Sequence, residues 1–407
     1  MNVIELFAGA AGLAQGFERT GKYQTLALYD KFEPAKNSYK SYSPDANYEL
    51  IDITELRDEQ IYKTLDGQRL DGILGGPPCQ GFSLLGKRKQ DDDINNLVLA
   101  YAKVVKQIKP SFLVMENVPQ LLFHPLFYPL IKELSEYFCI TYGILNAARY
   151  GTPQTRHRLF LIAYRRDYNK KPTFPQPTHG QEGQYIYSYH LNDSNELVVL
   201  NNETSHSIFG ADLVINRKGA QQVEKVINTV SPKLEPLVTV GDAISDLVSS
   251  AGKDSLQKYT HEAQNLYQRA LRQDSEYVAN CIARQHSGER LSQLQNVREG
   301  GRLEVYDIQS SKKRYYSQAY GRLHRAGLAR TLTTYFQNAG SGRFFHYSQP
   351  RTLTIREAAR LQGFNDDFIF HGNLAEQMQL VGNAVPLPLA EAIGRHIYNE
   401  LGFLIEN

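Results

Sequence analysis

The sequence predicts an α/β fold, in which a mostly parallel sheet with helices on both faces is joined to a smaller, irregular domain. Three observations support this expectation. Apolar runs typical of buried strands alternate with helical patterns through the first 165 residues. A proline-rich stretch, "KKPTFPQPTHG", then interrupts the alternation, and a polar region follows it. The chain has 407 residues, which fits one large domain and a smaller one.

The expected strands and helices follow from the spacing of apolar residues. Strand-like runs cover residues 2–7, 25–30, 48–53, 70–76, 111–118 and 158–164. Helices are expected after the glycine-rich turn at residues 8–12, from about residue 33, over 94–108, after Pro119, from about 352, and over 388–401. Because parallel strands end at the same edge of a sheet, a ligand is expected at their carboxyl ends.

The region between the proline-rich stretch and residue 350 carries a local positive charge. The whole chain has a net charge of only +2, but residues 251–350 hold 15 lysines and arginines against 8 acidic residues, interleaved with tyrosines. Such a stretch is either a solvated face or a surface that contacts phosphates. We expect a large domain over residues 1–173, completed by 375–407, and a smaller domain over 174–374.

Cysteine usage and hydropathy indicate where the protein works. Cys79, Cys139 and Cys281 lie far apart and form no Cys-x-x-Cys pair. Neither a disulfide framework nor a cysteine-rich zinc site is therefore expected. The apolar start has no basic region, and no run of about 18 apolar residues occurs in the chain. These features predict a cytoplasmic protein with no membrane segment and no metal.

The first turn and two aspartates suggest an adenosine-containing cofactor. "LFAGAAGL" follows the first strand and opens a helix, and its Gly9 and Gly12 let the backbone approach a ligand closely. Asp30 ends the second strand about 20 residues later, where an acid can accept hydrogen bonds from ribose hydroxyls. Asp52 follows the third strand and could meet an adenine amino group. Each aspartate alone could equally be an exposed loop acid or a helix cap.

The stretch "DGILGGPPCQGFS", residues 71–83, places Cys79 directly after two glycines and two prolines. A lone cysteine is commonly a small buried hydrophobe, but a nucleophilic one needs fixed placement and a lowered pKa. Glu116 ends the next strand, in "MENVP". Arg156 and Arg158 alternate in "QTRHRLF", so both are expected on one face of a strand. The conjunction of these four residues at successive sheet positions indicates a catalytic site.

These motifs together resemble the cytosine-5 DNA methyltransferases of bacterial restriction–modification systems, which use S-adenosyl-L-methionine. The resemblance spans nearly the whole chain. In order, it rests on "ELFAGAAGL", Asp30, "DI" at Asp52, "GGPPCQGFS", "MENV", "QTRHRLF", "RTLTIREAARLQGF" and "VGNAVP". It implies a Rossmann-like S-adenosylmethionine-dependent methyltransferase fold, with a target-recognition domain over residues 174–374.

The resemblance implies methyl transfer to carbon 5 of a cytosine flipped out of a short, specific duplex DNA sequence. Carbon 5 is too weak a nucleophile alone, so the Cys79 thiolate would first add to carbon 6. Glu116 would contact ring nitrogen 3 and the exocyclic amine. Arg158 would hold the carbonyl oxygen, and Arg156 would help to order the site.

The resemblance also implies contact residues and four departures from the family pattern. Positions that match cofactor contacts are Phe7, Gly9, Gly12, Asp30, Asp52, Ile53, Pro77, Leu97, Asn383 and Ala384. Candidate DNA contacts are Ser83, Lys87, Arg88, Lys312, Lys313, Arg314, Arg322, Arg325 and Thr333. The departures are Glu5 for aspartate, Ala11 for glycine, Asn365 for proline and Leu380 for glutamine.

Double-stranded DNA is the implied partner, and a cognate restriction endonuclease would act on the same site without binding the expected monomer. Three other interpretations compete: an RNA cytosine-5 methyltransferase of the same fold, a non-catalytic DNA-binding regulator, and an NAD-dependent oxidoreductase. The long 174–350 insert favours DNA over RNA. The complete set of Cys79, Glu116, Arg156 and Arg158 disfavours a regulator. The glycine spacing of the first turn disfavours an oxidoreductase.

Overall fold

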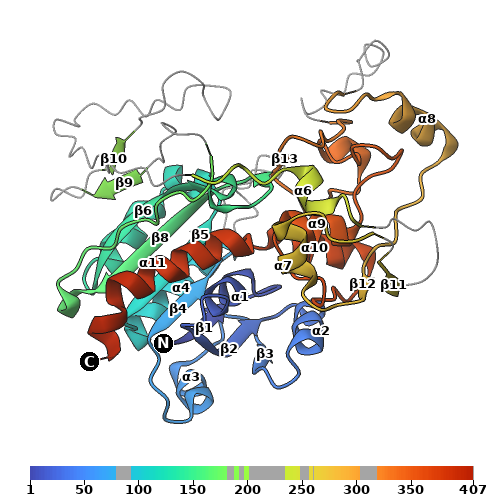
Figure 1. Cartoon of the computed structure of the whole chain (residues 1–407). Coiled ribbons are helices and arrows are strands. Elements are labelled where there is room, and N and C mark those ends of the chain that lie inside the picture. The colour runs from blue at the N-terminus through green and yellow to red at the C-terminus, as the bar shows by residue number, and fades with distance from the viewer. Residues whose placement is uncertain are drawn as a thin grey trace.

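The computed structural model describes residues 1–78, 93–180, 188–191, 197–200, 234–247, 256–259, 261–302 and 319–406 (Figure 1). Its centre is a nine-stranded sheet in the order β10-β9-β6-β8-β5-β4-β1-β2-β3. The five strands from β3 to β5 run parallel to one another. They are β1 (Asn2–Leu6), β2 (Gln24–Asp30), β3 (Tyr48–Leu50), β4 (Gly72–Gly75) and β5 (Phe112–Asn117). The predicted α/β fold is confirmed for this half of the sheet.

The other half of the sheet is antiparallel, which the sequence did not predict. The strand β8 (His157–Arg165) runs opposite to β5 and to β6 (Phe138–Asn146). The short strands β9 (Ser188–Leu191) and β10 (Leu197–Leu200) extend this half. Because β8 is reversed, it begins at the edge where the parallel strands end. The arginines that precede and open β8 therefore reach the expected ligand edge.

Helices cover the first face of the sheet. Because successive side chains of a strand point to opposite faces, every second strand residue packs against these helices. On this face Ile4, Ile73 and Leu113 are fully buried in one apolar cluster. The helices that contribute to the cluster are α3 (Asp58–Leu65), α4 (Asp93–Ile108) and α5 (Phe127–Leu134). The helix expected directly after Pro119 is a 3₁₀ turn, and α5 begins only at Phe127.

On the second face, Val3, Leu74 and Val114 are buried by two helices. These are α1 (Gly12–Glu18) and α11 (Leu387–Glu406), and α11 lies across the sheet in Figure 1. The two helices approach so closely that a Cβ on Gly16 would lie 2.4 Å from the Ala390 Cβ. The helix α2 (Glu33–Tyr42) lies beside them. Helices on both faces match the expected architecture.

A second group of elements gathers beside the carboxyl ends of the parallel strands, on the right in Figure 1. It consists of α6 (Val240–Ile244), β11 (Leu256–Lys258), α7 (Leu266–Arg272), β12 (Tyr277–Ala279), α8 (Gly288–Asn296), β13 (Ala329–Arg330), α9 (Ile355–Leu361) and α10 (Leu374–Asn383). One buried cluster joins Ala10 and Leu28 of the sheet region to Val240, Phe336 and Phe364 of this group. Among the described helices, none is long and apolar enough to span a bilayer.

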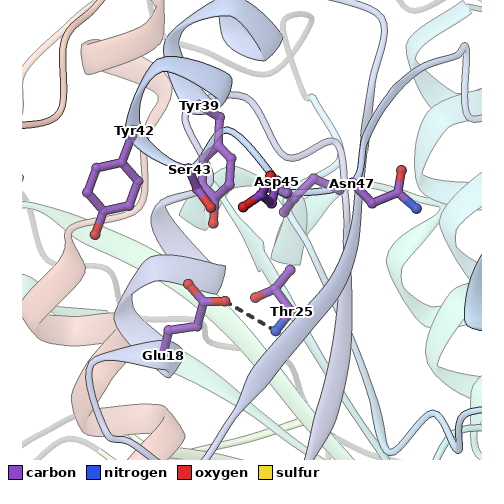
Figure 2. Close-up of a pocket in the computed structure, with 9 residues that line it drawn as sticks. Glu18, Thr25, Tyr39, Tyr42, Ser43, Asp45 and Asn47 are labelled. Carbon is purple, nitrogen blue, oxygen red and sulfur yellow. Dashed lines mark hydrogen bonds between the residues drawn. The ribbon is translucent and has the colours of Figure 1, made fainter.

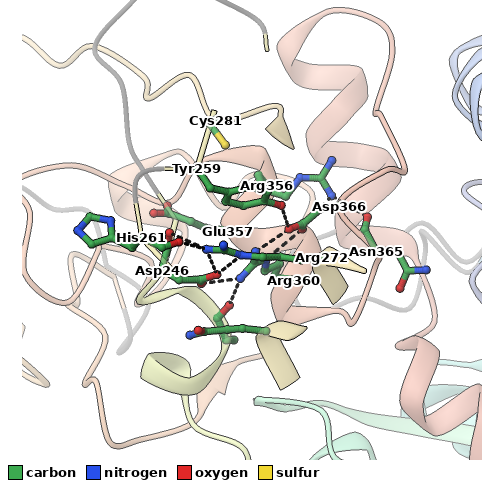
Figure 3. Close-up of polar contacts among 12 residues, drawn as sticks. Asp246, Tyr259, His261, Arg272, Cys281, Arg356, Glu357, Arg360, Asn365 and Asp366 are labelled. Carbon is green, nitrogen blue, oxygen red and sulfur yellow. Dashed lines mark hydrogen bonds and ion pairs between the residues drawn. The ribbon is translucent and has the colours of Figure 1, made fainter. Parts of the chain in front are cut away.

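A buried ion network holds the second group together (Figure 3). Arg360 donates to the Asp246 carboxylate at 2.6 Å and to the Asp366 carboxylate at 2.5 Å. Arg272 lies 2.6 Å from the second oxygen of Asp246. Arg360, Asp246 and Asp366 are fully shielded from solvent, so each charge depends on its partners. The network links α6, α7, α9 and the loop after α9 into one unit.

Candidate active site

Glu116 and Arg158 form a buried ion pair at the carboxyl edge of the sheet. Arg158 Nε lies 2.9 Å from Glu116 Oε1. The contact is a close ion pair, and Oε1 accepts no well-aligned hydrogen bond within the described residues. Burial raises the pKa of Glu116, and the charges of Arg158 and Arg156 oppose the rise. The result is a carboxyl group that can hold a proton and has an acceptor to spare.

The exit from β4 is fixed beside this pair. Asn117 Nδ2 donates a 3.1 Å hydrogen bond to the Pro77 carbonyl oxygen. A Cβ on Gly76 would lie 3.4 Å from Glu116 Oε2, so this part of the chain is in van der Waals contact with Glu116. Cys79, one position after the last described residue of this segment, lies outside the described residues. The chain that leads to it is therefore held against the end of β5, next to Glu116.

Arg156 reaches a different set of partners from Arg158. It lies between β7 (Gln154–Thr155) and β8 and is buried. Its Nη1 donates to the Leu332 carbonyl oxygen at 3.1 Å, and its Nη2 donates to the Gly382 carbonyl oxygen at 3.0 Å. Burial lowers the pKa of Arg156, and the nearby Arg158 charge adds to this effect. Arg156 thus joins three distant segments.

The proposed cofactor edge is built around Gly9 and Asp30. Asp30 Oδ2 accepts a 2.8 Å hydrogen bond from the Gly9 N–H, and Oδ1 accepts one of 2.9 Å from the Phe32 N–H. Tyr48 donates to the Gly9 carbonyl oxygen at 2.8 Å. Phe7 has a φ of 57°, a strained conformation for a residue with a side chain. The turn is therefore held in shape by Asp30 and Tyr48.

A Cβ on Gly9 would meet no atom within 4 Å, so open space lies directly beside Asp30. Burial raises the pKa of Asp30, and the hydrogen bond from Gly9 is the largest effect opposing this rise. Each Asp30 oxygen still has a lone pair free to accept a ribose hydroxyl. The acceptor oxygens of Asp30 and the open space over Gly9 fit the nucleoside part of S-adenosyl-L-methionine.

Asp52 lies at the end of the same edge in an ion pair with Lys31. The distance from Lys31 Nζ to Asp52 Oδ2 is 2.7 Å. Thr54 donates to Asp52 Oδ1 through both its backbone N–H and its hydroxyl. The hydrogen bond from Lys31 is the largest effect lowering the pKa of Asp52, which falls to about 2. Asp52 is therefore ionised and partly engaged before any ligand binds.

Two departures from the family pattern lie at the first turn, where Glu5 adds a hydrogen bond and Ala11 adds backbone strain. Glu5 is buried and accepts a 2.8 Å hydrogen bond from the Ala14 N–H in the first turn of α1. Burial raises the pKa of Glu5 to about 8. Ala11 adopts a φ of 56°, which glycine tolerates better. A third departure, Asn365, accepts a 2.5 Å hydrogen bond from Arg19.

The remaining cofactor candidates flank this turn. A Cβ on Gly12 would lie 2.4 Å from the Val385 carbonyl oxygen, so the turn touches the segment that carries Asn383 and Ala384. Ile53 is buried in the cluster under β1 and β4, and Leu97 is half-buried on α4. These positions come from four different elements.

Some of the expected DNA contacts lie outside the described residues, two are at least partly accessible, and one, Arg322, is buried. Ser83, Lys87, Arg88, Lys312, Lys313 and Arg314 lie outside the described residues. Arg325 is exposed, with its guanidinium 4.9 Å from the centre of the Tyr347 ring. Thr333 is half-buried beside α10, because a Cβ on Gly382 would lie 2.7 Å from its carbonyl carbon.

The assignment of Arg322 as a phosphate contact was wrong. Its side chain is buried, and its guanidinium donates to four backbone carbonyl oxygens. They belong to Leu294, Val297, His346 and Gln349. Donors that are buried and already bonded to the backbone cannot reach a DNA phosphate.

The sequence analysis missed two buried glutamines at this edge. Gln154 Oε1 accepts a 2.8 Å hydrogen bond from the Leu332 N–H. Gln154 Nε2 donates to Gln362 Oε1 at 3.0 Å, and Gln362 Nε2 donates to the Val381 oxygen at 2.7 Å. Both residues stand inside the quoted motifs "QTRHRLF" and "RTLTIREAARLQGF". Their places within these motifs indicated that both residues lie near the site. They were passed over because an uncharged amide is not a usual catalytic group.

A separate cavity of about 540 Å³ lies between α1, α2 and β2 (Figure 2). Its lining includes Glu18, Thr25 and Tyr39, and Glu18 Oε1 accepts a 3.2 Å hydrogen bond from the Thr25 N–H. Thr25 lies near the start of β2, whereas Asp30 ends that strand. None of the expected catalytic or cofactor residues that the structure describes lines the cavity, so it is distinct from the site at the carboxyl edge.

Comparison with known proteins places this arrangement in one family. The family model for C-5 cytosine-specific DNA methylase matches residues 1–399. The Type II methyltransferase M1.HphI of Haemophilus parahaemolyticus is 30% identical, and the match covers 98% of this chain and 86% of that protein. The Type II methyltransferase M.DdeI of Desulfomicrobium norvegicum is also 30% identical, over 98% of this chain and 88% of that protein.

A solved structure supports the fold. It is described as a DNA modification methyltransferase encoded within an E. coli prophage, and it superposes with a TM-score of 0.70. The sequence identity is 24%, and the match covers 99% of both chains. The family match is consistent with the residues that the structure places at the carboxyl edge of the sheet. The chain belongs to the C-5 cytosine-specific DNA methylase family and is a DNA (cytosine-5) methyltransferase.

Proposed function

We propose that the protein transfers a methyl group from S-adenosyl-L-methionine to carbon 5 of a flipped-out cytosine within a short duplex DNA sequence. The observation that carries this proposal is the Glu116–Arg158 pair, held 2.9 Å apart beside the chain that leads to Cys79. A cytosine that enters this edge would meet a nucleophile, a carboxyl group and a guanidinium together. These are the groups that the reaction requires.

Each residue has a proposed role in the chemistry. The Cys79 thiolate adds to carbon 6, and the electron pair of the 5,6 double bond moves to carbon 5. Glu116, whose pKa burial raises, holds a proton at ring nitrogen 3 as negative charge develops on the ring. Arg158 binds the carbonyl oxygen and stabilises the same charge. Once carbon 5 has taken the methyl group, water takes the carbon-5 proton. The electron pair of that C–H bond restores the 5,6 double bond as the bond from carbon 6 to sulfur breaks and releases the Cys79 thiolate, and the proton at ring nitrogen 3 returns to Glu116.

The cofactor, when bound, supplies an electrophilic methyl group on a sulfonium. Asp30 would accept hydrogen bonds from the ribose hydroxyls, beside the open space over Gly9. Asp52 would meet the adenine amino group, and Ile53 would contact the base. Phe7, Gly12, Pro77, Leu97, Asn383 and Ala384 would complete the pocket wall. The open space and the acidic groups along one edge support this assignment.

The second group of elements would read the DNA sequence. Phosphate contacts give affinity without sequence information, whereas contacts with base edges specify the site. Arg325 and Thr333 are the expected contacts that the structure describes. Ser83, Lys87, Arg88, Lys312, Lys313 and Arg314 are proposed from the sequence alone. A monomeric cytoplasmic enzyme of this kind would protect host DNA from a cognate restriction endonuclease.

Two experiments test the proposed function. Purified protein with labelled S-adenosyl-L-methionine and genomic DNA should label cytosines within one sequence, which sequencing would map. A duplex with 5-fluorocytosine at the mapped site should form an adduct that survives denaturation, because fluorine cannot leave as a proton does. Cys79→Ser should lose this adduct while still binding DNA. Label on RNA instead of DNA would favour the RNA methyltransferase.

A further inference from the structure

Leu332 attaches the segment that carries Thr333 to the catalytic sheet through both of its backbone polar groups. Its N–H donates to Gln154 Oε1 at 2.8 Å, and its carbonyl oxygen accepts from Arg156 Nη1 at 3.1 Å. Two more bonds flank this clamp. The Ala329 N–H donates to the Pro153 oxygen at 3.0 Å, and Thr331 donates to the Thr155 oxygen at 3.0 Å. The proposed DNA-reading segment is thus anchored to β7.

The same side chains also hold the segment proposed to contact the cofactor. Gln154 Nε2 donates to Gln362 Oε1 at 3.0 Å. Gln362 Nε2 then donates to the Val381 oxygen at 2.7 Å and to the Ala384 oxygen at 3.2 Å. Arg156 Nη2 donates to the oxygen of Gly382 at 3.0 Å. The carboxamides of Gln154 and Gln362 are both buried, so water cannot replace these bonds without cost.

Two glycine contacts make the connection continuous. A Cβ on Gly382 would lie 2.7 Å from the Thr333 carbonyl carbon and oxygen. A Cβ on Gly12 would lie 2.4 Å from the Val385 carbonyl oxygen. The end of α10 therefore touches the Thr333 segment on one side and the cofactor turn on the other. If the Thr333 segment or the cofactor turn moves, the movement must either pass to the other segment or break the hydrogen bonds of the Gln154 and Gln362 side chains.

We propose that Gln154 and Gln362 are positioning residues that couple DNA binding to cofactor binding. The amide pair fixes Leu332 and the end of α10 in one arrangement, so a ligand that orders either segment prepares the other for its own ligand. Coupling of this kind is reciprocal, and factors of about fivefold or more are typical. The inference rests on the proposed function for the identity of both ligands.

The test measures the dissociation constant of S-adenosylhomocysteine by calorimetry, with and without a duplex that contains the mapped site. The ratio of the two constants is the coupling factor. We expect a factor of about five or more in the native enzyme, and a factor near one in Gln154→Met and Gln362→Met. Methionine keeps the length of the side chain and removes the amide. The double variant should be no worse than the more affected single variant.

Gln337→Met is the matched control. Gln337 is equally buried and donates to the Leu353 oxygen at 3.0 Å, but both residues lie between β13 and α9 within the second group of elements. It should lose stability to a similar extent and keep the coupling factor. Gln362→Glu is a second variant in case Gln362→Met fails to fold, because it keeps the acceptor toward Gln154 and loses the donor toward Val381.

Each outcome has one meaning. A coupling factor that stays at the native value in the Gln154 and Gln362 variants overturns the proposal. A coupling factor that is lost in these variants and also in Gln337→Met overturns it too. A native enzyme that binds both ligands with a factor of one also overturns it, while the proposed function stands. Failure of the native enzyme to bind S-adenosylhomocysteine at all would instead contradict the proposed function.

Discussion

Arg158 approaches Glu116 from a strand that runs opposite to the strand of Glu116. Their side chains meet at 2.9 Å because β8 is antiparallel to β5, with Glu116 paired to Phe160 and Asn117 paired to Leu159. A parallel β8 would carry Arg158 to the far edge of the sheet. The reversed strand is therefore what places a cation beside the buried carboxyl group.

Arg158→Met should move the pH dependence of kcat as well as lower its value. Activity requires protonated Glu116 and falls as pH rises through the pKa of this group, which burial raises. Removing the Arg158 charge disfavours the carboxylate further, so the falling limb should shift to higher pH. Loss of the contact with the carbonyl oxygen should lower kcat by about 10²–10³-fold. Steady-state rates from pH 5 to pH 10 would measure both effects.

Arg165→Met is the control, because Arg165 lies at the other end of β8 and pairs with the exposed Asp167. This variant should change neither the pH at which kcat falls nor the value of kcat. A falling limb that stays in place in Arg158→Met would show that Glu116 does not set the pH dependence.

Asp30→Ala should weaken cofactor binding by about 1–3 kcal/mol, the cost of a lost hydrogen bond to a charged group. DNA affinity in the absence of cofactor should not change. The cofactor affinity of Asp30→Asn should lie between those of the native protein and Asp30→Ala, because asparagine keeps one oxygen to accept from Gly9 or Phe32. Asp45→Ala, in the separate cavity of Figure 2, is the control. An unchanged dissociation constant in Asp30→Ala, by calorimetry, would rule out the assignment.

Glu5→Gln should change how the stability of the protein depends on pH. Folding raises the pKa of Glu5 from 4.5 to about 8, so between these values the folded state holds a proton that the unfolded chain has lost. The free energy of unfolding should therefore fall as pH rises through this window, by about 1.4 kcal/mol for each pH unit. Glutamine removes the titration and keeps an acceptor for the Ala14 N–H.

Urea unfolding at pH 5 and pH 8 would show the effect as a smaller difference in Glu5→Gln than in the native protein. Glu59→Gln, at an exposed position on α3, should keep the native difference. Equal pH dependence in native protein and Glu5→Gln would mean that Glu5 is ionised when buried.

Arg360→Met should destabilise the protein by about 3–5 kcal/mol, because it leaves the buried carboxylates of Asp246 and Asp366 without their shared partner. Arg395→Met breaks an exposed pair with Glu391 and should cost less than about 1 kcal/mol. Chemical denaturation of both variants gives the comparison. Similar values for the two variants would show that the network in Figure 3 does not stabilise the second group of elements.

The parallel half of the sheet could be predicted because each of its strands is an apolar run with helical patterning between runs. The strand β6 could not, since "FCITYGILN" mixes polar and small residues with apolar ones. Its burial comes from pairing with β8 and from α5, which are properties of the assembled sheet. The direction of β8 also depends on this pairing, and apolar spacing does not encode direction.

The site residues show a similar limit. The places of charged residues at strand ends, such as Asp30 and Glu116, could be predicted from the sequence, and their roles stay predictions. Arg322 was misassigned because a count of basic residues cannot tell a solvated guanidinium from one bonded to backbone carbonyl oxygens. The roles of Gln154 and Gln362 arise from contacts across about 200 residues of chain, which no local pattern contains.

The clamp on Leu332 uses only backbone atoms of that residue, and this has a consequence for how the family diversifies. Gln154 and Arg156 grip an N–H and a C=O that every amino acid except proline offers at this position. Side chains of this segment other than the Thr331 hydroxyl and the buried Leu332 can therefore be exchanged while both backbone bonds of Leu332 stay in place. Under the proposed function, a new target sequence can then arise without change to the catalytic residues, so specificity and chemistry are free to evolve at different speeds.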